Sequence, residues 1–585
     1  MAETLISPGV LALENDQSFI TQQPVNVGAA MIGPTVKGPV EIPTIVTSYS
    51  DYQSKFGTTF LSGSQVYTYF TSIAAFNYFN NGGETLLISR VVSGAFSSAT
   101  TATGSVTGGL GGGVSILNSA SLAEALVLNT ISQGTIMNSS CSLVSGGSLS
   151  ASGSANNIRW QIANQDTSQG TFSLFIRRGN DTSNSPTILE SWTNLSMDPT
   201  APNFVSRIIG NQVKLYNSND NQIETTGDFP NNSRYVFVQS VKTPTPFYFD
   251  NNGVAKPTLT GSLPANGSGS FLGATGNLFG AGADYYNNID VASTNTQGLP
   301  SSSYDNMINL MANADDYKYN VLLTPGLFAN TAAIGASQVT TAISNTQNRG
   351  DAIYVPDLVP FSSSVNDATT AANAKNTSYA ASYWPWVQTV DPDAAQLVWV
   401  PASVMVGGVY AYNDSVSEPW FAPAGINRGG LSSVVRAEKK LTQSQRDTLY
   451  TNKVNPIATF PGTGVVVYGQ KTLQTQASAL DRVNVRRLLI ALKSYISQVA
   501  QNLVFEQNTI ATRTSFLNQI NPYLESVQQR QGLYAFKVVM DDSNNTPDVI
   551  DRNQLVGQIY LQPTKTAEFI YLDFNILPTG ATFPA

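Results

Sequence analysis

Apolar strand patterns and helical patterns alternate along two separate stretches of this chain, and this alternation limits its fold more than any other feature. Strand patterns at residues 25–33 and 84–92 flank helical segments, and the same plan returns after Ser301. Strands that alternate with helices favour a parallel sheet covered by helices. We therefore expect a discontinuous α/β core that consists of residues 25–92 together with residues 276–470.

Two helices are expected in the first of these stretches. Ser48 or Ser50 can cap a short helix that ends at Gly57, because a serine hydroxyl accepts from the free amide groups of a first turn. A longer helix is expected from Gln65 to Phe79, where apolar side chains recur at helical spacing.

The residues between the two stretches have a different composition. Residues 93–275 are poor in charge and rich in Gly and Ser, and they contain alternating strand patterns such as residues 170–181 and 234–241. This texture predicts a β-rich insertion of one or two subdomains. The fold class expected for the whole chain is therefore multidomain, α/β plus β.

The two ends of the chain are predicted to be extended. Residues 1–24 contain a turn at Pro8 and Gly9 and then show no sustained hydrophobic period, which predicts an extended arm. Residues 471–585 begin with the longest helical pattern and continue into strands, which predicts an α+β C-terminal domain.

The last strand pattern, "KTAEFIYLDFNI" from Lys565 to Ile576, raises a question of pairing. A lone strand is not stable in water, and its free backbone groups are a template for another chain. The sequence leaves open whether its partner is in the same chain or in a neighbouring one. Its alternating faces contain Glu568, Ile570, Leu572, Phe574 and Ile576 on one side, and Phe569, Tyr571, Asp573 and Asn575 on the other.

Basic residues are concentrated in one part of an acidic chain. The formal net charge is −8, yet we count ten Lys or Arg against three acids between residues 434 and 493. Such a stretch indicates an acidic partner, a neighbouring copy of the chain, or simply a solvated basic face. In the long helix, Arg482, Arg486 and Lys493 lie away from the apolar stripe, and Arg487 is next to Arg486.

Several classes of chemistry are disfavoured. The chain has no histidine and a single cysteine, Cys141, which removes histidine-based catalysis, histidine metal ligands and an intrachain disulfide. The loop "GVVVYGQKT" places Lys471 one step from the position that a phosphate-binding loop requires. Asp541, Asp542, Asp548 and Asp551 lack the spacing of a calcium loop, so a solvated acidic turn is preferred. We expect no enzyme activity, no cofactor and no metal.

The sequence predicts a protein that is made in a cytoplasm and stays soluble there. No signal peptide begins the chain, and no run of about 18 apolar residues is present that a bilayer-spanning helix needs. We therefore expect no direct insertion into a membrane.

Several segments together resemble the tail sheath proteins of contractile-tailed bacteriophages. The predicted insertion, which contains "FSLFIRRGND", resembles the sheath of the larger contractile phages in particular. The other matching segments, in chain order, are "SPGV", "GPVEIPTIVTSYSDYQSKFG", "NNGGETLLISRVV", "FAPAGINRGGL", and the run from "VNVRRLLIALKSYI" through "AEFIYLDFNI".

This resemblance implies an architecture. In the family, the N-terminal arm and the C-terminal domain form an inner layer around a tail tube. A non-catalytic domain similar in fold to subtilisin lies outside this layer, and the insertions lie on the exterior surface. Subunits stack as six-membered rings in a helical tube and exchange arms by strand addition. The expected location is the virion tail, after assembly in the host bacterial cytoplasm.

The resemblance also implies partners and residue roles. The partners would be further copies of the chain, the tail tube protein, and baseplate and tail terminator proteins, but no nucleic acid. Arg482, Arg486, Arg487 and Lys493 would face the tube, although contact with a neighbouring sheath subunit is an alternative. Contraction would drive the tube through the host envelope, with hinges at Pro8 and Gly9 and near Ala567.

A different function class stays open from the residues alone. The Gly/Ser-rich insertion would suit a β-rich virion adhesion or baseplate component. The α/β core, the basic helix and the lack of internal repeats favour the sheath interpretation over a fibre.

Overall fold

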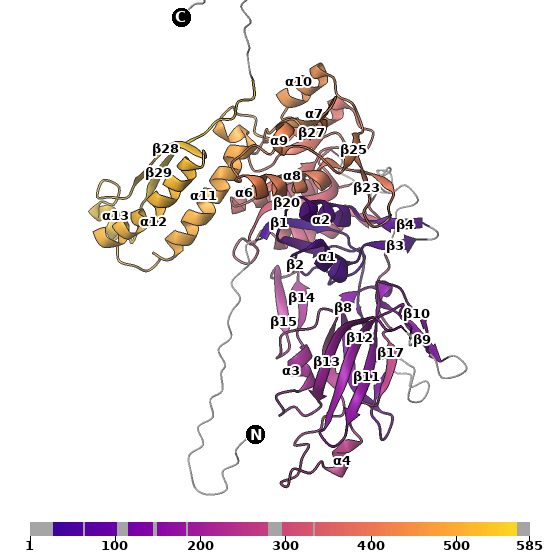
Figure 1. The fold of residues 1–585 in the computed structure, drawn as a ribbon. Coiled ribbons are helices and arrows are strands. Elements are labelled where there is room, and N and C mark those ends of the chain that lie inside the picture. The colour runs from indigo at the N-terminus through magenta and orange to yellow at the C-terminus, as the bar shows by residue number, and fades with distance from the viewer. Residues whose placement is uncertain are drawn as a thin grey trace, which may run out of the picture.

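The computed structural model describes residues 27–62, 65–101, 115–143, 149–182, 185–278, 295–330 and 334–569. Figure 1 shows a central α/β core, from which a β-rich insertion extends downward and a helical C-terminal unit extends to the left. The expected arm at residues 1–24, with Pro8 and Gly9, lies outside the described residues.

A five-stranded sheet forms the centre of the core. Its order is β2 (Thr44–Val46), β5 (Leu86–Arg90), β1 (Val27–Gly33), β20 (Tyr319–Phe328) and β21 (Ile353–Asp357), and only the β2–β5 pair is antiparallel. Because β1 pairs with β20, the segments before and after the insertion lie side by side in one sheet. The alternation in the sequence therefore does correspond to a mostly parallel sheet.

Helices cover both faces of this sheet. Successive side chains of β1 point to opposite faces, and both sets are buried. Ala29 and Met31 pack in one hydrophobic cluster with α2 (Phe70–Asn80) and α8 (Ala402–Val416). Ala30 and Ile32 point to the opposite face. That face packs against α5 (Asp305–Leu310), α6 (Ala336–Arg349) and α7 (Val365–Asn373).

Smaller sheets extend the core. A parallel bridge between Tyr354 and Ala380 connects the five-stranded sheet to a second one. The second sheet has the order β22 (Ser382–Trp384), β26 (Val454–Phe460) and β27 (Gly464–Val467), and a third has the order β24 (Leu397–Val400), β23 (Val387–Val390) and β25 (Val434–Ala437). The helices around them are α9 (Gly425–Arg428) and α10 (Gln443–Thr451).

The first expected helix is confirmed, and the second is correct only in part. Helix α1 (Tyr49–Phe56) is capped by Ser48, which accepts from the Asp51 amide, and it ends at Gly57 with φ of 73°. The segment from Gln65 to Thr68, however, is strand β4, paired with β3 (Thr59–Ser62), and α2 begins at Phe70. Tyr67 stacks on Phe60 across this hairpin, a contact that a helix could not make.

The insertion is β-rich, as expected. Its two larger sheets enclose one hydrophobic cluster, and Arg90 of the core reaches toward it, donating to the carbonyl oxygens of Gly38 and Gln133. One sheet has the order β13 (Ile188–Ser196), β12 (Thr171–Arg178), β11 (Ile158–Asp166) and β17 (Gly267–Ser270); the other has β16 (Val236–Val241), β8 (Glu124–Gln133) and β6 (Ser98–Thr100).

The C-terminal unit is a helical hairpin packed on a two-stranded sheet. Helices α11 (Val483–Gln501) and α12 (Ile510–Gln529) share a cluster with β28 (Leu533–Val539) and β29 (Gln558–Pro563). A short helix, α13 (Pro547–Asp551), lies between the strands. Residues 565–569 form no strand, and the remainder of the predicted last strand, with Ile570, Tyr571, Leu572, Phe574 and Ile576, lies outside the described residues.

Candidate functional site at the C-terminal anchor

Arg482 and Glu568 join the start of α11 to the segment that leaves the C-terminal unit. Arg482 is the N-cap of α11 and has extended backbone dihedrals, which direct its side chain away from the helix. Its Nε donates to Oε1 of Glu568 at 2.7 Å and its Nη2 donates to Oε2 at 2.9 Å. A bidentate guanidinium–carboxylate pair has both strength and a defined direction, so it determines where the chain leaves.

Residues of the core complete this anchor. The hydroxyl of Tyr450, on α10, donates to Oε2 of Glu568 at 2.7 Å. The amide of Gln470 donates to Oε1 of Glu568 at 3.0 Å and to the hydroxyl of Thr566 at 2.5 Å. Residues 566 and 568 are therefore both held by the core, and exposed Ala567 lies between two fixed points.

The electrostatics of the anchor favour a charged carboxylate. Burial alone raises the pKa of Glu568, but the hydrogen bonds from Arg482, Tyr450 and Gln470 outweigh it and hold that pKa below its usual value. Burial and the bond to Glu568 raise the pKa of Tyr450, so the phenol keeps its proton and remains a donor.

The expectation of an exposed basic helix is wrong for Arg486 and Arg487. Arg487 is 3% exposed, pairs with Asp414 and lies over the Tyr410 ring, with its Cζ 4.8 Å from the ring centroid. Arg486 is 4% exposed and lies over the Tyr379 ring, at a corresponding distance of 4.0 Å. In this conformation both guanidinium groups therefore face the core of their own chain.

The reason is that α11 is covered on two sides. Its apolar stripe packs on α12, and the opposite side packs on the core through Tyr379, Tyr410 and Asp414. No pattern within the helix reveals this second contact, because its partners lie about 70 to 110 residues earlier in the chain. Lys493, two turns further on, is exposed, and its ammonium is 3.3 Å from the Tyr379 hydroxyl.

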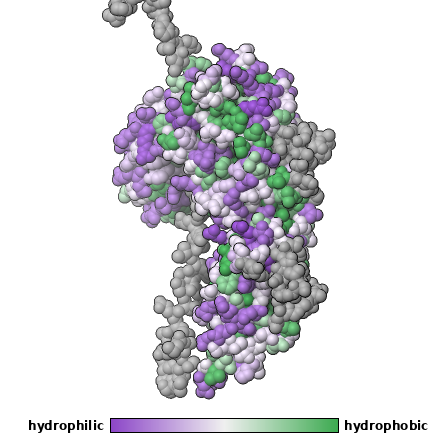
Figure 2. Space-filling model, turned by 45° about the vertical axis from the view of Figure 1, so that its right-hand side comes forward, coloured by the Kyte–Doolittle hydropathy of each residue, from purple (hydrophilic) through white to green (hydrophobic). Residues whose placement is uncertain are grey.

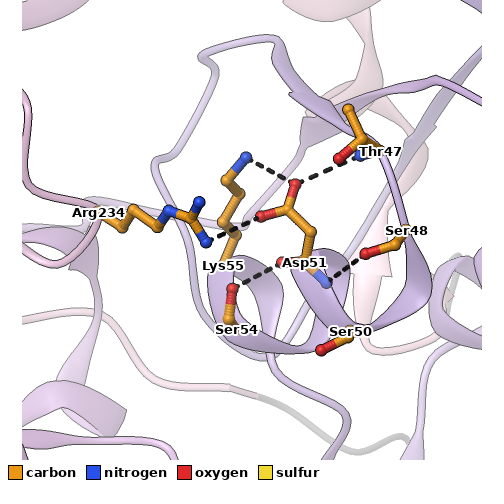
Figure 3. Close-up of a pocket in the computed structure, with 7 residues that line it drawn as sticks. All are labelled: Thr47, Ser48, Ser50, Asp51, Ser54, Lys55 and Arg234. Atoms are coloured by element: carbon orange, nitrogen blue, oxygen red, sulfur yellow. Dashed lines mark hydrogen bonds and ion pairs between the residues drawn. The ribbon is translucent and has the colours of Figure 1, made fainter. Parts of the chain in front are cut away.

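A polar cleft lies at the junction of the core and the insertion (Figure 3). Its volume is about 390 Å³, and Asp51 lies at its centre. The ammonium of Lys55 donates to Asp51 at 2.8 Å, and Arg234 of the insertion is 3.8 Å from the same carboxylate. The remaining lining residues are Thr47, Ser48, Ser50 and Ser54. With its central charge already paired, the cleft is a contact between two parts of the chain.

The other candidates for chemistry have structural roles. Lys471 lies over the Tyr450 ring, with its Nζ 4.5 Å from the centroid, and no helix follows the turn as a phosphate-binding loop requires. Asp542 and Asp548 pair with Arg513 and Arg552. Within the described ranges, no group of three or more acidic or cysteine side chains is placed to hold a metal ion, and no helix is long and apolar enough to cross a membrane.

Two later parts of the chain match models of known protein families. Residues 302–473 match the family model of the phage tail sheath protein central domain, and residues 475–577 match that of the phage tail sheath C-terminal domain. The boundary between the matches falls between β27 and α11, beside the anchor.

Individual relatives agree with these matches. The tail sheath protein of Vibrio phage KVP40 is 34% identical over 367 residues, which covers 61% of this chain and 53% of the relative. The tail sheath protein of Enterobacteria phage T4 is 41% identical over 185 residues, or 32% of this chain and 28% of the relative. The chain therefore spans about half the length of the first relative and less of the second.

A solved structure is similar along nearly the whole chain. It is the helical sheath of the anti-feeding prophage in the contracted state, with 15% identity and a TM-score of 0.47. The similarity covers 98% of this chain and 99% of that chain.

Proposed function

The chain belongs to the tail sheath protein family of contractile-tailed bacteriophages, and from that premise we propose that it is a self-assembling, non-enzymatic subunit of a contractile sheath. It polymerises as stacked six-membered rings around a tail tube. Contraction of the polymer drives the tube through the host cell envelope. Its site of action is the virion tail, after assembly in the host bacterial cytoplasm.

The observation that carries this proposal is the two-stranded sheet of the C-terminal unit. In the described part of the chain, β28 and β29 pair only with each other, so each has an outer edge with which no other strand pairs. Tyr534 and Tyr560 on these strands are also exposed. Such an edge accepts an added strand from another chain. The sheet is therefore suited to connecting subunits.

We assign the added strands to the two ends of neighbouring copies. The intersubunit strand consists of Glu568 and Phe569 with Ile570, Tyr571, Leu572, Phe574 and Ile576, and the N-terminal arm, residues 1–24, adds a second one. About six main-chain hydrogen bonds contribute roughly 1 kcal/mol each. Burial of Ile570, Leu572 and Phe574 contributes about 1.5–3 kcal/mol for each side chain.

The anchor has a function in this arrangement. Because Arg482, Tyr450 and Gln470 hold Glu568, the C-terminal strand starts from a fixed point on each subunit. Subunits that move as rigid bodies during contraction therefore need their C-terminal hinge beyond Glu568, later than Ala567. The N-terminal hinge stays at Pro8 and Gly9.

Further roles follow from the same family. The core is the non-catalytic, subtilisin-like domain, and the insertion faces the exterior. Lys493 is the exposed member of the basic set and faces the tail tube, with Arg482 at the partly exposed edge of the same helix. Baseplate and tail terminator proteins hold the two ends of the polymer.

The test is negative-stain electron microscopy of concentrated protein with two truncations. One ends at Phe569 and keeps the anchor, and the other ends at Thr564 and loses it. We expect striated hollow tubes from the full chain and none from the Phe569 truncation, because that variant keeps the anchor but lacks Ile570, Leu572, Phe574 and Ile576, the apolar residues of the strand that pairs between chains. Circular dichroism and thermal unfolding show that each truncated monomer is folded.

Each alternative result has a definite meaning. Tubes from the Phe569 truncation contradict the intersubunit strand but keep the sheath. If the full chain forms no polymer even when a tail tube and baseplate are supplied, the sheath function is wrong, and the adhesion or baseplate interpretation takes its place.

A further inference from the structure

An apolar tip lies at the turn between α11 and α12. The side chain of Phe505 is fully exposed, and Val504 and Ile510 beside it are 60% and 68% exposed. Leu503, in contrast, turns inward and packs on the hydrophobic cluster of the C-terminal unit. We name Val504, Phe505 and Ile510 the apolar tip.

The conformation of this turn is held by specific contacts. Phe505 has φ of 72°, a left-handed conformation that is unfavourable for a bulky residue. The Glu506 amide donates to the Leu503 carbonyl at 3.1 Å, and the Asn508 side chain donates to the Gln554 carbonyl at 2.9 Å. Strained backbone that the surroundings hold in place is typical of functional sites. The exposure of Phe505 is therefore built into the fold.

Acidic residues lie beside the apolar tip in sequence and on the neighbouring segment. Glu506 adjoins it in sequence, and the segment between β28 and β29, which Asn508 contacts at Gln554, contains four exposed aspartates, two of them on α13. Among the nearby cations, Arg513 and Arg552 pair with Asp542 and Asp548. The hydrogen bonds from Ser543 lower the pKa of Asp541, and the nearby charge of Lys537 lowers that pKa further. The exposed aspartates are Asp541, Asp542, Asp548 and Asp551.

A second apolar surface lies on the β24–β23–β25 sheet, on the opposite side of the molecule (Figure 1). Val390 on β23 lies directly opposite Leu397 on β24, and they are 49% and 51% exposed. Val435 on β25, beside an irregularity in the pairing, is 55% exposed. We name Val390, Leu397 and Val435 the sheet patch. Figure 2, with this side of the molecule turned forward, shows hydrophobic groups gathered on the upper half.

Two exposed cations lie on or just after β25, beside the sheet patch. Arg436 is exposed and lies over the Trp399 ring, with its Cζ 5.1 Å from the centroid, and Lys440 is also exposed. The acids of these strands face inward: Asp391 is fully buried, and Asp393 accepts hydrogen bonds from Tyr49 and Gln53. Glu438 is nearly buried and lies near Lys439, which is partly exposed.

We propose that the apolar tip of one copy of this chain docks on the sheet patch of the next copy. Both surfaces are apolar at the centre, and their rims have opposite charge, which is the arrangement of a specific interface. Because the two surfaces differ and lie on opposite sides, the contact is head to tail and builds an open helical polymer. This inference rests on the proposed function and specifies which surfaces the copies use.

Cysteine cross-linking between two chains tests the contact. In a Cys141→Ser background, one chain has Val504→Cys and keeps Phe505, and the other has Val435→Cys and a size tag. We expect a short bifunctional maleimide to give a tagged–untagged dimer when the two are mixed. The matched control replaces Val435→Cys with Val254→Cys, which is 61% exposed on the insertion, and should give only background.

Charge reversal provides a second readout on the same pair. Glu506→Lys with Asp551→Lys on the first chain should lower the yield roughly tenfold, because facing charges then repel. Arg436→Glu with Lys440→Glu on the second chain should restore it. Thermal unfolding shows that each variant is folded.

The outcomes separate this inference from the proposed function. The docking contact is wrong if the yield of cross-linked dimer equals that of the Val254→Cys control. It is also wrong if this yield does not recover after the charges on the second chain are reversed. If tubes form but no cross-linked dimer is found, the sheath function stands, and the apolar tip binds a different partner. If the cross-link forms but no tubes appear even when a tail tube and baseplate are supplied, the contact stands and the sheath function is contradicted.

Discussion

At the scale of single residues, Glu568 shows how a few side chains determine where a chain leaves its domain. We predict that Glu568→Gln weakens the anchor by about 1.5–3 kcal/mol, the usual contribution of hydrogen bonds to a charged group. The amides of residues 564–569 should then exchange hydrogen faster, while the core keeps its unfolding temperature. Glu525→Gln, at an exposed glutamate on α12, is the matched control. Unchanged exchange in Glu568→Gln would show that the carboxylate does not hold this segment.

The same anchor should depend on pH. The pKa of Glu568 is lower in the folded protein than its ordinary value of about 4.3, so its stabilisation is present above that ordinary value. It is lost as the pH falls through the depressed folded value. Hydrogen exchange of residues 564–569, followed from neutral to acidic pH, should therefore speed up only on the acidic side, and the Glu568→Gln variant should show no such step.

At the scale of elements, α1 provides a direct comparison of two adjacent serines. Ser48 accepts from the Asp51 amide, whereas Ser50 is within the first turn and makes no corresponding cap. We predict that Ser48→Ala lowers the free energy of unfolding by about 1 kcal/mol. Ser50→Ala is the control and should change it by much less. Equal losses in the two variants, measured by denaturant unfolding, would contradict the assignment of Ser48 as the cap.

Elements also show where local patterns mislead. The spacing of Val66 and Tyr69 fits a helix, yet residues 65–68 pair with β3, because Phe60, Tyr67 and Tyr69 form an aromatic cluster of their own. Similarly, Thr509 caps α12, and this helix continues through Pro522, although a proline inside a helix usually ends or kinks it. Tertiary packing overrides local propensity in both segments.

At the scale of the whole molecule, Arg90 connects the core to the insertion. Its side chain is fully buried, its Nη1 group donates to two carbonyl oxygens, and burial lowers its pKa to about 10. We predict that Arg90→Met lowers the free energy of unfolding by about 1–3 kcal/mol, because these carbonyls lose a buried donor. It should also speed proteolysis between the core and the insertion.

Arg234→Ala is the comparison for that variant. Arg234 also spans the junction, but its side chain is 64% exposed and 3.8 Å from Asp51, and such a surface pair contributes roughly 0–1 kcal/mol. If both variants are equally stable and equally resistant to protease, the junction does not depend on Arg90.

The sequence by itself determined the kinds of element and their order: the α/β alternation, the β-rich insertion, the long helix and the lack of histidine chemistry. These follow from local periodicity and composition, which act within a few turns of chain. Only the tertiary structure decided what covers each element. Arg486 and Arg487 look solvent-facing on α11, but the core buries them against Tyr379, Tyr410 and Asp414. Glu568 finds Arg482 across 86 residues of chain, and no local pattern encodes a partner at that distance.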